Sequence, residues 1–205
     1  MRKLITLVVI VFSVASVSAQ KGSMYIGTSG IDLGGEQLSQ AGLPNLNPMT
    51  GFTTVSFGDE KMSMYGLAPE FGYFVADNMA VGAGLFFKGI SMDDGDDKAS
   101  LSIFGINPYL RYYCLNKGNF KAYVQAGLTY ATISGDMIND MTMSLFDISV
   151  MPGISYNLTE KFAINATLGS LGYGNLSIKD VDDSFSTFGL DLNLTSLKFG
   201  FTLSF

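Results

Sequence analysis

The sequence predicts an all-β chain, folded as an eight-stranded antiparallel up-and-down transmembrane β-barrel with short turns at one end and longer loops at the other. Three observations lead to this fold class. Runs of alternating apolar residues recur along the chain, a unit of strand, tight turn and strand repeats roughly every 40 residues, and only 15% of the residues are charged. A water-soluble domain has about 25% charged residues, so much of this surface is expected to face something other than water.

The first 19 residues predict a secretory signal peptide. The positively charged pair Arg2-Lys3 precedes an apolar run over residues 4–14, and the small residues Val17-Ser18-Ala19 follow. This is the order of a cleavable signal. The apolar run is too short to span a bilayer as a helix, although a retained membrane anchor is the alternative. Residues 20–205 are then one domain, the barrel.

Eight strands are predicted in order along the mature chain. The first covers residues 22–30 and the last covers residues 196–205. Between them lie three hairpins, which begin with the similar segments LAPEFGYFV, INPYLRYYC and VMPGISYNL. Each segment contains a proline, and because proline cannot donate to a β-ladder we expect a β-bulge at Pro69, Pro108 and Pro152. The longer loops are expected at residues 36–61, 91–98, 134–142 and 174–187.

The two faces of these strands differ in composition. At the period of two residues that a strand imposes, one face is apolar, as at Leu85 and Phe87, and the other is mostly Gly, Ser, Thr and Asn, as at Gly82 and Gly84. A face in water would be dense in Lys and Glu, whereas glycines suit the crowded lumen of an eight-stranded barrel. The apolar face is therefore expected to contact lipid and the other face to line the lumen.

The chain ends on an alternating strand whose last residue is aromatic. The apolar face of that strand consists of Leu197, Phe199, Phe201, Leu203 and Phe205. Together with the signal peptide, the eight strands and the sorting of short turns from long loops, this end resembles the small bacterial outer-membrane β-barrel family of OmpA/OmpX type. The resemblance implies a porin-like protein in the outer membrane of a Gram-negative cell, with the short turns in the periplasm and the loops outside. It also implies that these five side chains face outer-membrane lipid and that the barrel assembly machinery reads the terminal aromatic residue.

Five ionisable residues fall on the predicted lumen face: Glu70, Lys88, Arg111, Asp147 and Lys198. Charges in a confined space of low dielectric constant are costly unless they are paired. We expect Glu70 to pair with Arg111 or Lys198, and Asp147 to lie within reach of Lys88. Such pairs would form a structural plug or, alternatively, a gate that opens a narrow pore.

The sequence predicts no enzyme and no cofactor. It contains no His, so a serine nucleophile would lack its usual base. Cys114 also has no His partner and is predicted on the lipid face. The glycines of VGAGLF lie in a strand that leads to no helix, so they do not form a dinucleotide loop. A net charge of −6 argues against a nucleic-acid partner, which requires a basic surface.

Two loops are rich in aspartate, SMDDGDDK and DVDDS. Carboxylates can hold a hard cation such as Ca²⁺, but the spacing does not match the EF-hand calcium loop, because no Glu lies at its twelfth position. We expect a solvated acidic rim and no metal site, with a Ca²⁺ site as the alternative.

Three functions remain compatible with the sequence. The first is an outer-membrane barrel with a largely plugged lumen and a structural or surface-recognition role through its extracellular loops, whose partner no motif identifies. The second is a narrow porin-like channel for ions or small solutes. The third is a soluble periplasmic barrel that binds an apolar ligand.

Overall fold

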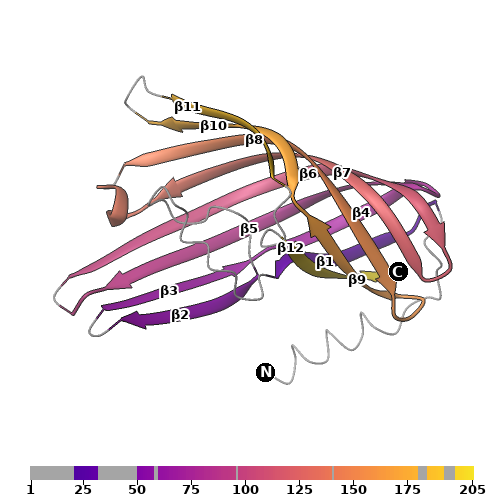
Figure 1. Cartoon of the computed structure of the whole chain (residues 1–205), viewed down its shortest axis with the longest axis horizontal. Coiled ribbons are helices and arrows are strands. Elements are labelled where there is room, and N and C mark those ends of the chain that lie inside the picture. The colour runs from indigo at the N-terminus through magenta and orange to yellow at the C-terminus, as the bar shows by residue number, and fades with distance from the viewer. Residues whose placement is uncertain are drawn as a thin grey trace.

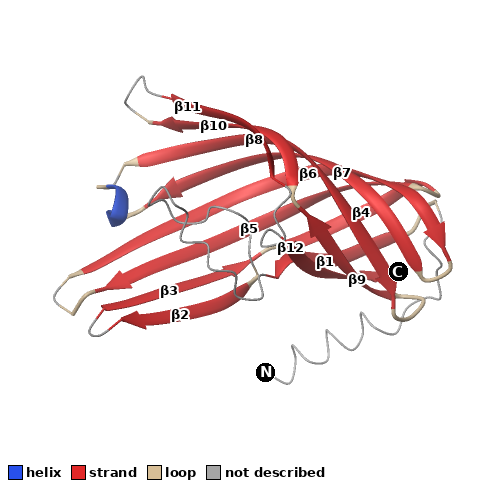
Figure 2. Ribbon diagram, viewed as in Figure 1, coloured by secondary structure: helices blue, strands red, loops and turns tan. Residues whose placement is uncertain are grey.

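The computed structural model of the chain describes residues 21–31, 50–57, 60–95, 97–139, 141–179, 184–191 and 197–205. The predicted signal peptide lies outside these residues. Most of the described chain is in strands, as Figure 2 shows, with one short 3₁₀ helix at Asp136–Ile138. No helix in the described part of the chain is long and apolar enough to cross a membrane.

The described residues form twelve strand segments in one sheet. In chain order they are β1 (Met24–Ile31), β2 (Gly51–Phe57), β3 (Glu60–Leu67), β4 (Pro69–Ala76), β5 (Met79–Asp93), β6 (Lys98–Lys117), β7 (Phe120–Ser134), β8 (Thr142–Asn157), β9 (Phe162–Leu168), β10 (Ser170–Ile178), β11 (Ser184–Asp191) and β12 (Leu197–Ser204).

These segments make eight barrel strands. β5, β6, β7 and β8 are single long strands, whereas the other four barrel strands consist of two segments each: β1 with β2, β4 with β3, β9 with β10, and β12 with β11. In the half of the barrel where β1 begins and β12 ends, the order β8-β7-β6-β5-β4-β1-β12-β9 is closed by pairing of β9 with β8. Every pair is antiparallel. The predicted eight-stranded antiparallel barrel is therefore confirmed, with the first strand paired to the last (Figure 1).

The strands extend further at the loop end than the sequence predicted. β5 and β6 are separated by residues 94–97 alone, and β2, β10 and β11 occupy positions that were expected in the loops 36–61 and 174–187. Those loop boundaries were wrong because polar residues in alternation were taken for loop residues. In β2, for example, Thr54 and Ser56 alternate with Val55 and Phe57, which is the pattern of a strand with one wet face.

The outer surface of the barrel is apolar over the height expected of a membrane-spanning strand. Large exposed side chains line it on all sides, among them Val81, Leu85, Leu110, Val124, Leu128, Ile148, Val150, Ile154, Ile164 and Phe201. Towards the loop end each barrel strand then places one exposed aromatic residue on this surface: Phe52, Tyr65, Phe87, Phe104, Tyr130, Phe146, Tyr173 and Phe188. We call these eight residues the outer girdle, because aromatic residues gather at the membrane interfaces of such barrels.

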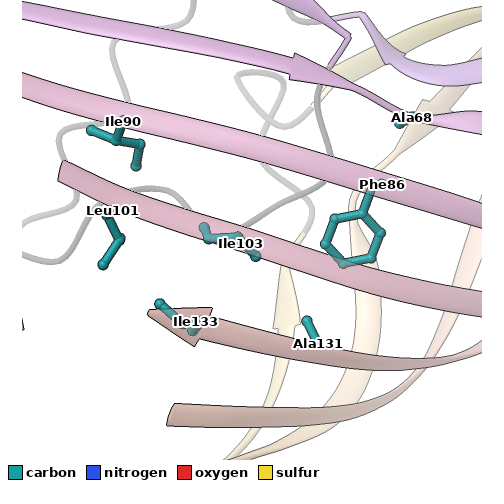
Figure 3. Close-up of a cluster of buried hydrophobic side chains, with 7 residues drawn as sticks. All are labelled: Ala68, Phe86, Ile90, Leu101, Ile103, Ala131 and Ile133. Carbon is teal, nitrogen blue, oxygen red and sulfur yellow. The ribbon is translucent and has the colours of Figure 1, made fainter. Parts of the chain in front are cut away.

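Beyond the outer girdle the polarity of the two faces of the barrel sheet is reversed. The inner face becomes apolar, with a buried cluster of Ala68, Phe86, Ile90, Leu101, Ile103, Ala131 and Ile133 (Figure 3). Met137 and Ile138 of the 3₁₀ helix pack against this cluster. The outer face at the same height is polar, as Ser100 and Ser102 illustrate. The outermost part of the protein is thus folded like a water-soluble β-structure, with its core inside.

The prolines do not follow the predicted rule of one bulge each. The register of β6 runs through Pro108 without a shift against either neighbour, so the predicted bulge at this residue is wrong. The Asn107 side chain donates a hydrogen bond to the Leu128 carbonyl oxygen (3.2 Å), beside the place where proline has no N–H to offer. Near Pro152 the irregularity lies on the neighbouring strand, which is interrupted at Gly169 between β9 and β10.

Candidate functional site

The lumen in the periplasmic half of the barrel is occupied by a buried charge pair. Glu70 of β4 and Arg111 of β6 approach to 3.4 Å, and each side chain is only 3% exposed. Arg111 Nη2 reaches both carboxylate oxygens at this distance, and Arg111 Nε donates to the Gln125 side chain at 2.9 Å. Charge-assisted bonds are usually about 2.7–2.9 Å long, so the guanidinium is held most closely by Gln125, and the carboxylate balances its charge.

Three tyrosine rings surround the same guanidinium. Its central carbon lies 5.5 Å from the ring centre of Tyr25, 5.1 Å from that of Tyr109 and 4.7 Å from that of Tyr123. These distances are within the range of a cation–π interaction, which strengthens when the cation is desolvated. Arg111 Nη1 is buried and has no hydrogen-bond partner among the described residues, so the ring faces are its remaining favourable contacts.

The tyrosines fit into the lumen because each lies over a glycine of the neighbouring strand. Tyr25 is paired with Gly72, Tyr109 with Gly82, and Tyr123 with Gly153. A Cβ atom added to any of these glycines would collide with the opposite ring. The glycines that the sequence assigned to a crowded lumen therefore have a specific use, since they leave room for rings that lie flat against the wall.

We call Glu70, Arg111, Gln125, Tyr25, Tyr109 and Tyr123 the lumen plug. Its members come from β1, β4, β6 and β7, and Tyr25 and Tyr109 are joined by a hydrogen bond of 2.8 Å between their hydroxyl groups. Sequence analysis identified the two charged members. It missed the three tyrosines and Gln125, although their place on the lumen-facing positions of the strands was a signal that could have found them.

A cavity of about 310 Å³ lies between the lumen plug and the apolar cluster of the outer half. Its lining includes Arg111 and Tyr123 from the plug and Phe86 from the cluster. Asp147 and Lys198, both predicted in the lumen, also line it. Asp147 accepts a hydrogen bond from the Ser149 hydroxyl at 2.9 Å.

The fifth predicted lumen residue, Lys88, is buried on the inner face of β5 with 2% exposure. The expected proximity of Asp147 to Lys88 stays a prediction. The alternative partner for Glu70, Lys198, lines the same cavity, but the ion pair that the structure gives Glu70 is with Arg111.

The five apolar residues of the terminal strand differ in exposure. Phe199 and Phe201 are exposed on the outside of the barrel, whereas Leu197, Leu203 and Phe205 are half-buried. Whether the assembly machinery reads this end stays a prediction.

The remaining sequence candidates are dispersed. Cys114 is exposed and donates to the Ala122 carbonyl oxygen. At the junction of β5 and β6, Asp93 at the end of β5 forms an ion pair with Lys98 at the start of β6, at 2.9 Å. In the turn between them, Asp94 accepts a hydrogen bond from the Asp97 amide. Among the described residues, no three His, Cys, Asp or Glu side chains converge as a metal site would require. Much of the second acidic stretch, DVDDS, lies outside the described residues.

Comparison with known proteins gives one family. The outer membrane protein beta-barrel domain matches residues 4–205. The chain is similar to the crystal structure of the outer membrane protein OprG from Pseudomonas aeruginosa, with 16% identity, 92% of this chain and 98% of that chain covered, and a TM-score of 0.50.

Two other solved structures are also similar. Neisserial surface protein A (NspA) has 15% identity, covers 90% of this chain and 94% of its own, and gives a TM-score of 0.44. The N-terminal β-barrel domain of Pseudomonas aeruginosa OprF has 14% identity, with 91% and 99% covered and a TM-score of 0.39. At such low identity the similarity to OprG shows the fold alone. A comparison with curated protein sequences gave no match.

Proposed function

The chain belongs to the outer membrane protein beta-barrel domain family, and on this premise we propose that it is a non-conducting outer-membrane barrel whose role is structural or lies in recognition at the cell surface. It is an outer-membrane protein, so the hypothesis of a soluble periplasmic barrel is wrong. A further part of the proposal is that it has no enzymatic activity, because a chain without histidine lacks the usual general base of a serine hydrolase.

The lumen plug is the observation that supports a closed barrel. A fully buried guanidinium is expensive to strip of water, and here its lost hydration is replaced by Gln125, Glu70 and three aromatic rings. An ion that crossed the lumen would have to displace these groups together. The apolar cluster on the inner face of the outer half lies beyond the plug as a second layer of packed side chains.

The cavity between these two layers favours the second candidate function, a narrow channel for ions or small solutes. Its volume of about 310 Å³ is at the lower end of the range for small-molecule sites, about 300–1,000 Å³. A channel would require the lumen plug to open, with Glu70 and Arg111 as the gate.

Planar-bilayer conductance separates the two candidates. Refolded mature protein, checked by its different gel mobility before and after boiling, is expected to give no single-channel steps. The double variant Glu70→Ala/Arg111→Ala removes both charges together, so that neither is left unpaired, and is expected to give steady steps.

The matched control for this measurement is Glu160→Ala/Lys161→Ala. It removes one charge of each sign from the turn between β8 and β9 and is expected to remain silent. Steady steps from the wild-type protein, altered by Glu70→Ala, would refute the closed barrel and support the channel.

A further inference from the structure

The cavity between the lumen plug and the apolar cluster is lined from every side of the barrel. Its volume of about 310 Å³ corresponds to about ten water molecules at about 30 Å³ each, which is also room for one solute of monosaccharide size. All eight barrel strands contribute lining residues. A solute bound here would not have to pass the lumen plug, so a site in this cavity goes beyond the proposed function of a closed barrel.

The cavity is open because the inward-facing glycines at this height are not covered by rings. Gly84 is paired with Asn107 and Gly174 with Asp147, whereas the glycines of the lumen plug are paired with tyrosines. A Cβ atom added to Gly84 would be 3.7 Å from its nearest neighbour, and one added to Gly174 would be 3.4 Å from the Thr187 hydroxyl. Short polar side chains opposite these glycines therefore leave a space that tyrosine rings fill elsewhere in the lumen.

Hydrogen-bonding side chains that are only half-buried line this space. Asn107, Thr129, Asp147 and Thr167 belong to this group and come from β6, β7, β8 and β9. The Asn107 amide donates to the Thr129 hydroxyl oxygen at 2.9 Å, and Asp147 accepts from the Ser149 hydroxyl at 2.9 Å, so bonds within the wall orient these side chains. A carboxylate has about four acceptor sites, and Asp147 therefore keeps the capacity to accept from hydroxyl groups of a solute.

Two further lining residues each have a buried polar atom without a hydrogen-bond partner among the described residues. These atoms are Arg111 Nη1, a donor, and Asn165 Oδ1, an acceptor. An unpaired polar atom in a buried position is unfavourable. An alcohol hydroxyl both donates and accepts, so a solute with several hydroxyl groups can pair with either atom once its side chain turns toward the cavity.

The charges of the lining favour a solute without charge. Arg111 and Lys198 are positive and Glu70 and Asp147 are negative, so the charges of the lining residues sum to zero. Lys88, the remaining ionisable residue of the lumen, is buried further out on β5 and does not line the cavity. A charged solute would add a charge without a counter-charge in a confined space, which is costly.

The cavity borders the junction of the first and last barrel strands. Thr187 of β11 lines the cavity and is exposed. The ladder between β1 and β12 ends at Ile31 and Phe199, and in the described part of the chain β2 and β11, which continue these strands, pair with β3 and β10 alone. Figure 1 shows these two pairs of segments diverging at the loop end. A solute can therefore enter from that side while the lumen plug stays closed.

We propose that this cavity binds one uncharged, polyhydroxylated solute of monosaccharide size. Hydroxyl groups of the solute bond to the polar lining, with Asp147 and Asn165 as acceptors. Phe86, Leu145 and Met151 form the apolar part of the lining and contact the carbon–hydrogen face of the ring. A wholly apolar molecule would leave the polar groups of the lining unpaired, and an inorganic ion would leave the apolar part without a contact.

The test follows the methyl resonance of Met151 in protein with isotope-labelled methionine methyl groups, refolded in lauryldimethylamine oxide, a detergent that contains no sugar. The resonance is assigned with Met151→Leu. D-glucose is expected to shift it saturably, with a dissociation constant of about 1 mM, the strength expected of so small a ligand. The methyl resonance of Met24, which is exposed on the outside of β1, is expected to stay in place.

Two probes test the chemical class of the solute. D-glucuronate has the same ring with a carboxylate, and cyclohexanol has a ring of similar size with one hydroxyl group. Both are expected to bind at least about tenfold more weakly than D-glucose, since one adds an unbalanced charge and the other lacks most of the hydrogen bonds. Equal shifts of Met151 by all three probes would overturn the assignment to an uncharged polyol.

The variant Asn165→Leu removes one acceptor of the site at similar volume and is expected to weaken D-glucose binding about tenfold. Asn175→Leu makes the same change on the outer face of β10 and is expected to bind like the wild type. Each titration is repeated with the probe present during refolding, so that slow entry cannot hide the site. Absence of a shift under both conditions would mean a cavity that holds water only, and would overturn the proposal. If Asn165→Leu does not fold, the order of the three probes with wild-type protein decides.

Discussion

Removing one member of the buried Glu70–Arg111 pair should destabilise the barrel much more than removing both. Each side chain is 3% exposed, so a single substitution leaves the other charge buried without its counter-ion. Breaking a buried pair in this way costs about 3–5 kcal/mol, whereas replacing both partners by uncharged groups of similar volume is often neutral.

The structure refines these magnitudes for each variant. Glu70→Gln leaves Arg111 in contact with Gln125 and three tyrosine rings, and each cation–π contact is worth about 0.5–2 kcal/mol. Its cost is therefore expected near the lower limit, about 3 kcal/mol. Arg111→Met removes the cation and all of its contacts and strands the carboxylate, so about 5 kcal/mol is expected. The double variant Glu70→Gln/Arg111→Met should cost less than Arg111→Met alone, so the coupling energy between the two sites should be at least about 3 kcal/mol.

Urea titration in detergent micelles measures these free energies of unfolding, with the folded fraction read from gel mobility before boiling. The control Glu160→Gln/Lys161→Met changes the same kinds of side chain in the short turn between β8 and β9. It is expected to shift the free energy of unfolding by no more than about 0.5 kcal/mol. The reasoning is refuted if each single variant costs less than about 1 kcal/mol and the two effects simply add. That result would mean that water or relaxation of the lumen solvates the charges.

Three further predictions concern the fit of the lumen and the chemistry of the rim. Gly153→Ala should destabilise the barrel by about 1–3 kcal/mol, because the methyl group of the new alanine would collide with the Tyr123 ring. Gly84→Ala is the control. Its methyl group would lie 3.7 Å from the nearest atom, so it should change the free energy of unfolding little in the same urea titration. A hydrogen bond from Lys98 lowers the pKa of Asp93. The bond from the Gly95 amide to this carboxylate (3.1 Å) should therefore persist as the pH falls into the usual range of carboxyl pKa values, and be lost only below that range. Hydrogen exchange at Gly95 measures this, and a transition above pH 5 would contradict it. Calorimetric titration with Ca²⁺ should show no saturable heat, because Asp93 and Asp94 already bind groups of their own turn; a saturable heat lost in Asp94→Asn would show that the acidic loop binds the ion.

Local sequence patterns were sufficient for the architecture at membrane height. The alternation of Leu85 and Phe87 with Gly84 identifies a strand, and the small, mostly uncharged residues opposite the apolar ones identify which face meets lipid. Both inferences use only neighbours in the sequence, since side chains of a strand alternate between its faces. The same rule, applied to Thr54 and Ser56, could have predicted β2 beyond the membrane, but the polar residues there led to the prediction of a loop.

The lumen required the tertiary structure. The sequence matched Glu70 to Arg111 or Lys198 by their distances from the turns, and only the arrangement of strands around the barrel distinguishes these partners. The tyrosines could not be assigned to Gly72, Gly82 and Gly153 from the sequence, because each pair lies on two strands and exists only in one register.

The sequence by itself determined a membrane barrel with an apolar exterior. Each residue of a strand faces either the lipid or the lumen, and its polarity shows which, without knowledge of residues far away in the chain. The tertiary structure decided how the lumen is filled and that the apolar face moves to the inside beyond the outer girdle. Register and closure bring together residues that are far apart in the chain, and the free energy of a buried charge depends on those distant neighbours rather than on its own strand. For that reason the barrel could be read from single strands, and the plug could not.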